Sequence, residues 1–595
     1  MSRLSEIFAS LAALTLVRFV EGAPKAARWS NTTLGPDGPW NAIVVSLGDG
    51  QDVTVYPGKM WESYFLGESY CENTITKGQA CYAQQVGAIY NESAGTGHEP
   101  NISSSPGPFY TSNMIGIGMN GTRYTDSLFL GTDTTKRADD KVDNFDMVLV
   151  SNTQLQYPNG NKYPIFAGCL SFGAAPAMAN QTFVSINEWQ SDETVNTSLL
   201  TGTLFEQSAI DSQTFGMHIG STMPQQIPGS LYFGGYDRNR AVNDMLAVSI
   251  LDPYLEFSGA PLLDISINVV KGGSPFSWSS KEGLLATGNS SIGDRLSLSI
   301  DPCSPYLNLP KSTCDAIAAE LPVTYDEGLG LYLWDMDSPD HPRIVQSPTV
   351  LTFTFLDPND NSRLVNISVP FMHLNLVLDQ PLSDKPIPYF PCNAASNGNY
   401  ALGRAFLQDA FLGANLKTAV YFMSQAPGPN LNGESMTIMD NECRTLQTSN
   451  NHWETSWDEY WTPLPMPAEN KTGTIAGATV GGVVGGILLA LIGFIALRYQ
   501  RYGRGSSLCG LSLVKGRSPP DYSAESAVRT STKSPGEDSL QAPVSELPTN
   551  SGNSWQMPAA ATDGVAEMET PYTVHEMPGA IHEMPGSYVG RNWRY

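Results

Sequence analysis

Gly229-Ser230-Leu231-Tyr232-Phe233-Gly234-Gly235-Tyr236-Asp237 is the stretch that decides the fold, an aromatic and aliphatic run closed by paired glycines. Similar short runs of β-branched and aromatic residues, broken by Gly, Pro, Asn and Asp, occur at residues 42–45, 145–150 and 350–355. This spacing and turn chemistry predict an all-β chain of sandwich or barrel type. One of the few stretches with helical periodicity, residues 311–321, follows a proline start signal.

The composition is that of a globular, strongly acidic protein. Its 595 residues include 33 Lys or Arg and 58 Asp or Glu, so the net charge is 33 − 58 = −25. This charge argues against nucleic acid as a partner. The length exceeds one ordinary domain, although a bilobal fold could use most of it. The sequence has no metal-ligand spacing such as H-E-x-x-H, and we predict neither a metal nor a cofactor.

Two apolar segments predict a single-pass membrane protein. Residues 1–22 have the charged start, apolar core and small-residue end of a signal peptide. Residues 474–497 are an uncharged run of 24 residues, long enough to cross a bilayer of about 30 Å as a helix. Arg498, Arg501 and Arg504 follow, and the positive-inside tendency places them in the cytosol. We expect the N-terminal portion to face the cell wall or a vacuole lumen.

Candidate modification sites fit this orientation. Nine N-x-Ser/Thr sequons, all before the expected span, predict a glycosylated ectodomain: Asn31, Asn91, Asn101, Asn120, Asn180, Asn196, Asn289, Asn366 and Asn470. Seven of the eight cysteines lie on the same side, where disulfides persist. Because seven is odd, we expect at least one thiol to be free or to pair between chains.

The chain divides into six expected segments. They are the signal peptide (1–22), two ectodomain halves (23–228 and 229–425), a stalk (426–473), the membrane helix (474–497) and a tail (498–595). The tail is rich in Ser, Pro, Thr and Gly without periodic apolar residues, so we expect it to be disordered. It could recruit cytosolic partners or be inert.

Two spacings near the membrane suggest contacts. Glycines recur at G-x-x-x-G spacing within residues 474–497, which favours a homodimer through this helix. Trp453, Trp457 and Trp461 recur every four residues, which would align them on one helical face. We expect them to pack against the ectodomain, with anchoring at the membrane interface as the alternative.

Five stretches carry a family resemblance: Gln51 to Trp61, Phe166 to Gly173, Gly229 to Asp237, Leu298 to Leu309 and Tyr400 to Leu407. In this order they resemble the landmark strands of pepsin-type aspartic peptidases. With the signal peptide and the membrane anchor, the chain resembles a divergent, membrane-anchored group of filamentous-fungal members. The resemblance covers residues 38–425. It implies two β lobes related by a pseudo-twofold axis, with a substrate cleft between them.

The resemblance also implies one disulfide in each lobe: Cys71–Cys81 and Cys314–Cys392. It assigns no partner to three further cysteines: Cys169, Cys303 and Cys443. Sequence alone leaves the connectivity open.

The resemblance places the catalytic pair at Gly58 and Asp301. An aspartic peptidase needs two carboxylates about 3 Å apart that share one proton. Gly58 stands at the first position, and Asp301, in the run Asp301-Pro302-Cys303-Ser304, stands at the second. Glycine can neither accept nor donate a proton with its side chain. We therefore predict an impaired site in which Asp301 is a remnant or a structural aspartate.

Other positions also depart from the family pattern. Met114 stands where the family carries its flap tyrosine, with Tyr110 just upstream. Arg404 replaces the usual aspartate of the last motif. Tyr56 could occupy the vacant space under a shifted register, but a phenol with an ordinary pKa of about 10 is a poor base.

Three functions follow from this pattern. The leading one is a surface protein that binds or senses a peptide or wall polymer in its cleft without cutting it. The second is an active membrane-anchored aspartic endopeptidase of an acidic wall or vacuole, which would need Glu62 or another acid in the cleft. The third is a structural or adhesion module of the cell wall.

Overall fold

The computed structural model describes seven ranges of the chain: residues 23–74, 80–100, 117–131, 140–184, 194–250, 257–394 and 399–466. Several predictions fall outside these ranges: the signal peptide, the membrane segment, the tail, the sequons Asn101 and Asn470, and the flap positions Tyr110 and Met114. Within the seven ranges, no helix is long and apolar enough to span a bilayer. All seven belong to one compact unit of the chain.

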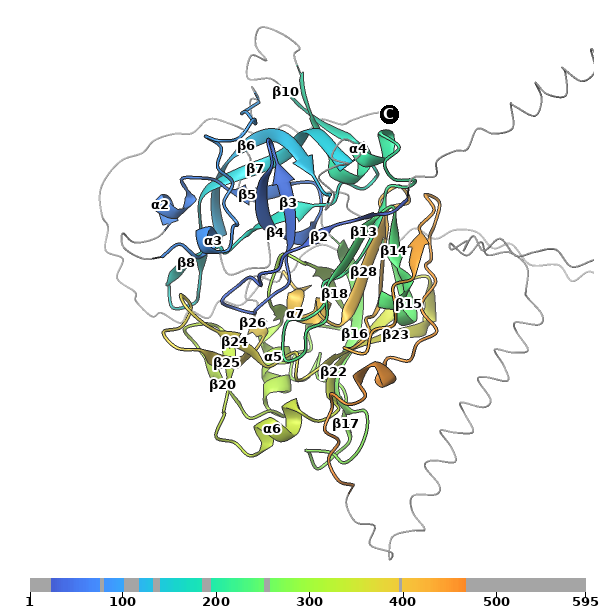
Figure 1. Ribbon diagram of the computed structural model, residues 1–595. Coiled ribbons are helices and arrows are strands. Elements are labelled where there is room, and N and C mark those ends of the chain that lie inside the picture. The colour runs from blue at the N-terminus through green and yellow to red at the C-terminus, as the bar shows by residue number, and fades with distance from the viewer. Residues whose placement is uncertain are drawn as a thin grey trace, which may run out of the picture. The chain divides into compact units, whose positions relative to one another are not determined.

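The first half of the chain forms a ten-stranded sheet (Figure 1). Its main path runs β10 (Asn180–Val184), β11 (Thr194–Ser198), β7 (Lys141–Gln156), β5 (Ser63–Leu66), β9 (Gly168–Ser171), β4 (Gln51–Lys59), β3 (Ile43–Leu47) and β2 (Arg28–Trp29). β6 (Ile117–Phe129) pairs with β3 and β7, and β8 (Lys162–Pro164) pairs with β7.

The second half forms an eight-stranded sheet and a smaller sheet of four strands. The larger follows β23 (Asp360–Pro370), β22 (Thr349–Asp357), β16 (Phe257–Val269), β18 (Leu296–Ile300), β27 (Ala401–Leu402), β19 (Leu307–Leu309) and β26 (Cys392–Ala394), with β17 (Ser280–Lys281) on β16. The smaller follows β20 (Val323–Asp326), β21 (Leu331–Trp334), β25 (Ile387–Phe390) and β24 (Leu376–Leu378).

A six-stranded sheet joins strands from both halves. It runs β1 (Lys25–Ala26), β13 (Ser230–Phe233), β12 (Thr214–His218), β28 (Ala410–Asn415), β29 (Val420–Gln425) and β15 (Val242–Ser249). The Gly229–Asp237 stretch supplies β13 to this sheet. It then supplies β14 (Gly235–Asp237), which pairs with β30 (Met436–Ile438). The glycine between them, Gly234, has φ +81, an angle that L side chains rarely adopt.

The same strand arrangement occurs once in each half. β4 pairs with β9 in parallel and β5 pairs with β9 antiparallel. β18 pairs with β27 in parallel and β19 pairs with β27 antiparallel. This repeat supports two lobes of related topology and confirms the mostly β fold.

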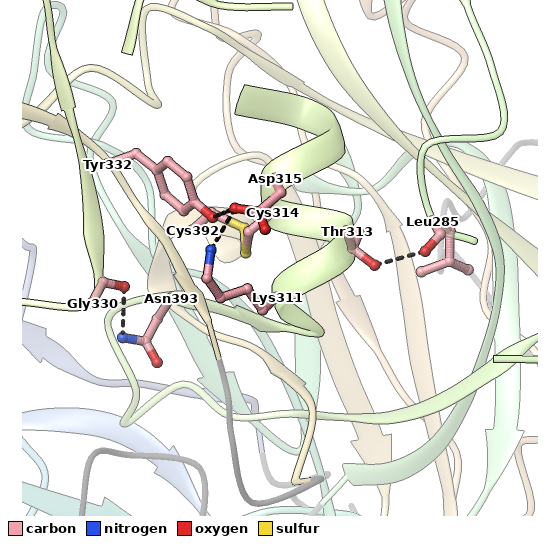
Figure 2. The surroundings of a disulfide bond; sticks show 9 residues. All are labelled: Leu285, Lys311, Thr313, Cys314, Asp315, Gly330, Tyr332, Cys392 and Asn393. Atoms are coloured by element: carbon pink, nitrogen blue, oxygen red, sulfur yellow. Dashed lines mark hydrogen bonds and ion pairs between the residues drawn. A yellow bond between two sulfur atoms is a disulfide. The ribbon is translucent and has the colours of Figure 1, made fainter. Parts of the chain in front are cut away.

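Helices are short: α2 (Tyr70–Thr74), α3 (Tyr82–Gln85), α4 (Leu200–Glu206), α5 (Lys311–Ala318), α6 (Asp340–Val345) and α7 (Arg404–Leu407). α5 confirms the helix predicted over 311–321, although it ends earlier. The Cys314–Cys392 disulfide ties α5 to β26, as Figure 2 shows. Beside it, Asp315 Oδ1 accepts from Lys311 Nζ and from the Tyr332 hydroxyl, each at 2.6 Å.

Residues 426–466, the described part of the expected stalk, pack onto the second lobe. Trp457 is fully buried and meets the His373 ring edge-on at 5.1 Å between centroids. Trp461 stacks on Trp457 at 5.2 Å. The tryptophans therefore pack against the ectodomain as expected. They do so without an α-helical face, because the regular structure between residues 453 and 461 is a single 3₁₀ turn, Glu454–Trp457.

Candidate functional site

Asp301 lies just past the carboxyl end of β18 and is 1% exposed. Its backbone N–H donates to the Leu402 carbonyl oxygen at 3.0 Å, which continues the pairing with β27. Its Oδ1 accepts from the backbone N–H of Cys303 at 3.0 Å, and its carbonyl oxygen accepts from Ser304 N at 3.1 Å. The carboxylate therefore helps to hold the turn of its own loop, a common structural use of aspartate.

Gly58 lies in a β-bulge near the end of β4. The pairing with β9 shifts between Pro57 and Lys59, which makes Gly58 the extra residue. Its φ is +115, a conformation that glycine tolerates and other residues rarely adopt. A Cβ built on Gly58 would lie 2.7 Å from Cβ and Cγ of Pro302, and 3.2 Å from Met217 Cε. The Pro302 ring therefore fills the space next to the first acid position.

A disulfide joins the two lobes at this point. Cys169, on β9, bonds to Cys303, in the loop after Asp301, with 6.1 Å between their Cα atoms. Both cysteines are buried. The sequence assigned neither a partner, because pairing depends on which strands are neighbours in space. One signal was present: each cysteine lies inside a family-like motif of a different lobe.

The other cysteines are also bonded. The two disulfides implied by the resemblance are present: Cys71–Cys81 and Cys314–Cys392. Cys443 is disulfide-bonded as well. The described residues contain no free thiol. Of the two expected alternatives, the free thiol is therefore wrong for this part of the chain, whereas pairing between chains stays a prediction.

The Arg404 side chain binds the backbone of the loop that follows Asp301. Its side chain is 3% exposed, and its Nη1 donates to the carbonyl oxygens of Cys303 at 2.7 Å and Pro302 at 3.2 Å. The guanidinium lies over the Tyr56 ring at 3.7 Å from the centroid and over the Trp40 ring at 5.2 Å. Arg404, which stands where the family usually carries an aspartate, therefore places a buried cation next to the loop that carries Asp301.

Asp37 is a buried carboxyl group in the electrostatic surroundings of Arg404. Burial raises the pKa of its carboxyl group, and Arg404 opposes that rise. Its Oδ1 accepts from Trp40 Nε1 at 2.9 Å, and its carbonyl oxygen accepts from the Tyr389 hydroxyl of the second lobe at 2.5 Å. Sequence reasoning missed Asp37. The available signal was Arg404 itself, since a buried arginine is rarely left without a counter-charge.

Two side chains considered as replacements for the missing acid have other interactions. Tyr56 packs under Arg404, and burial raises its pKa well above the ordinary value, which makes it a still poorer base at acidic pH. Glu62 forms an ion pair with Arg123, which also binds Asp146 at 2.5 Å. Burial raises the pKa of Glu62.

The comparisons with known proteins agree with this geometry. Residues 121–421 match the family model described as eukaryotic aspartyl protease, which is just over half of the 595 residues. The chain therefore belongs to this family. The matched part contains the Asp301 loop and begins after β4, the strand that carries Gly58. A search of curated proteins gave no match.

Proposed function

We propose that this chain is a non-proteolytic family member that binds a peptide or a cell-wall polymer at the cell surface. The observation that carries the proposal is the contact between Gly58 and Pro302, which fills the space beside the first acid position. Peptide hydrolysis by this family needs two carboxylates in one site. Groups that act as one catalytic unit lose orders of magnitude in rate when one is removed.

The membrane setting of the proposal comes from the sequence. The signal-like residues 1–22 and the apolar run 474–497 support a single-pass orientation with the lobes outside. The glycine spacing in the run supports a helix-mediated homodimer. In this arrangement the tail, residues 498–595, recruits cytosolic partners when the outer portion binds its ligand.

A protease assay tests the proposal. The purified full-length protein and its Asp301→Ala variant are incubated at acidic pH with a denatured protein substrate, and released peptides are measured by mass spectrometry. We expect no release above background from either. Peptides released by the wild type and lost in Asp301→Ala would overturn the proposal and favour the membrane-anchored endopeptidase.

A structural or adhesion role is a second candidate, favoured by the ties between the lobes. Besides Cys169–Cys303, the hydroxyls of Tyr157 and Tyr306 share a hydrogen bond of 2.9 Å, and Asn159 N donates to the Gly328 carbonyl oxygen at 3.0 Å. Such ties suit a rigid spacer. Deleting residues 498–595 separates the two roles: adhesion survives the deletion, whereas a sensor loses its output.

A further inference from the structure

We propose that a polar cavity on the first lobe binds a neutral oligosaccharide. The cavity has a volume of ≈ 530 Å³, within the range of about 300–1,000 Å³ of small-molecule sites. The turn between β3 and β4, residues 96–98, the end of β6 and the start of β7 line it. The inference rests on the proposed function, because a binding protein needs a ligand site.

The cavity is separate from the two segments that carry Gly58 and Asp301. Asp49, on its rim, precedes β4, whereas Gly58 lies near the other end of that strand. A strand rises about 3.3 Å per residue, so the two ends of β4 are roughly 25 Å apart. A ligand in the cavity therefore does not depend on access to Asp301, which is buried.

Hydrogen bonds around Asp126 make the cavity wall rigid. Its Oδ2 accepts from the Tyr90 hydroxyl at 2.6 Å, and its Oδ1 accepts from Thr96 Oγ1 at 2.7 Å and from Ser127 N at 2.8 Å. His98 is fixed next to them by two backbone hydrogen bonds with Thr125, of 2.9 and 3.0 Å. A wall that is ordered before binding loses less entropy when a ligand arrives.

Gly48 allows the β3–β4 turn to approach this wall. Its φ is +53, and a Cβ there would lie 2.6 Å from Asp126 Oδ2 and 2.9 Å from Thr96 Oγ1. Its N–H donates to the Ser127 carbonyl oxygen at 2.8 Å. The turn can therefore present Asp49, whose side chain is exposed, at the rim.

The exposed groups of the cavity suit a hydroxyl-rich ligand of no net charge. Asp49 offers acceptors, Asn144 offers an amide, and the exposed ring of His98 offers one more nitrogen. Phe129 adds one half-buried aromatic surface. The one lysine of the lining, Lys141, pairs with Asp143 at 2.6 Å. Sugars present hydroxyl groups at the ring edge and C–H groups on the face, which match this lining.

Charge decides against an anionic ligand. The whole chain carries −25, and a field of that sign disfavours phosphate or uronate groups. Two sources could supply a neutral glycan. One is an external polymer. The other is an N-glycan of this chain, because Asn144 Nδ2 donates to the carbonyl oxygen of the sequon residue Asn196 at 2.5 Å.

Calorimetric titration of the detergent-solubilised full-length protein tests the proposal. The probes are hexaoses of glucose, mannose and N-acetylglucosamine, with hexagalacturonate as the anionic comparison. The test variant is Asp49→Ala/His98→Ala. The matched control is Asp294→Ala/His452→Ala, which removes the same residue types at exposed positions outside the cavity. Each titration is repeated after enzymatic removal of N-glycans.

We expect at least one neutral hexaose to bind, with affinity lowered about tenfold or more in the test variant, since two hydrogen-bonding groups are lost. The control variant should bind like the wild type. Binding before deglycosylation indicates an external glycan, and binding only afterwards indicates that an N-glycan of the chain fills the cavity. No binding in either state, unchanged affinity in the test variant or a preference for hexagalacturonate would overturn the inference. None of these results would restore proteolysis, so the proposed function is tested separately.

Discussion

Cβ and Cγ of Pro302 lie 2.7 Å from the point that a Cβ on Gly58 would occupy. The two positions belong to the two loops that would carry the catalytic acids of a working family member. The residue types that fit at positions 58 and 302 are therefore coupled through packing. A carboxylate side chain placed at residue 58 alone would therefore clash with the Pro302 ring.

The first prediction concerns side chains at position 58. Gly58→Ala should lower the free energy of unfolding by about 2–4 kcal/mol, because it combines a strained positive φ with overpacking against Pro302. Gly160→Ala is the matched control. Gly160 has φ +81 with no atom within 4 Å of its added Cβ, so it tests the backbone strain alone. Urea unfolding measures both variants.

Adding Pro302→Ala should recover part of the loss in Gly58→Ala and none of the loss in Gly160→Ala. Gly58→Asp should release no peptides at acidic pH. Equal losses at the two glycines, or proteolysis by Gly58→Asp, would show that Pro302 does not fill the acid position.

A second prediction concerns the disulfide between the lobes. Cys169 and Cys303 are 134 residues apart, whereas Cys71 and Cys81 are 10 apart. Chain entropy then gives about 5 kcal/mol for the long link and about 3 kcal/mol for the short one. Replacing both cysteines of each pair by alanine should lower the melting temperature more for Cys169/Cys303, measured by scanning calorimetry. The reverse order would mean that the link between the lobes adds little constraint.

A third prediction concerns the buried ionisable residues Arg404 and Asp37. Arg404→Leu should cost about 3 kcal/mol of unfolding free energy, because it removes the donors to two carbonyl oxygens and the nearby positive charge that opposes the rise in the pKa of Asp37. Adding Asp37→Asn should recover part of that loss, since the carboxyl group affected by this positive charge is removed. Asp37→Asn in the wild-type background serves as the control. Additive losses in the double variant would show that the two residues are not coupled.

A fourth prediction concerns pH. Burial lowers the pKa of His218 to about 3, with a smaller effect of Arg240 in the same direction, from an ordinary value of about 6.5. Below a pH of about 6.5, the imidazole of His218 binds a proton in the unfolded chain but stays neutral in the folded chain. His218 therefore makes the free energy of unfolding fall as the pH falls. Between about pH 7 and pH 5 the loss is about 2 kcal/mol.

His218→Gln isolates this effect, because a glutamine amide can keep the hydrogen bond that Nε2 donates to the Gln408 carbonyl oxygen at 2.7 Å. Urea unfolding across this pH range should show a flatter decline for the variant. Buried carboxyl groups with raised pKa values, such as those of Asp37, Asp146 and Asp409, have the opposite sign. They are common to both proteins and cancel in the comparison. Identical slopes would show that His218 titrates normally.

The sequence by itself determined the local features. Alternating and aromatic runs gave the strands, as at Ser230–Phe233, because a half-buried strand needs that pattern over a few adjacent residues. The proline before Lys311 marked the start of α5. The absence of a carboxylate at Gly58 can also be read from the sequence, because it follows from matching one strand to the family's first active-site motif.

The tertiary structure alone decided how these features act together. The Cys169–Cys303 bond, the Arg404 guanidinium over the Tyr56 ring, and the Pro302 ring against Gly58 each join residues more than a hundred positions apart. No local periodicity encodes such pairs. They depend on which strand ends meet when the two lobes close, and that is set by the packing of the whole core.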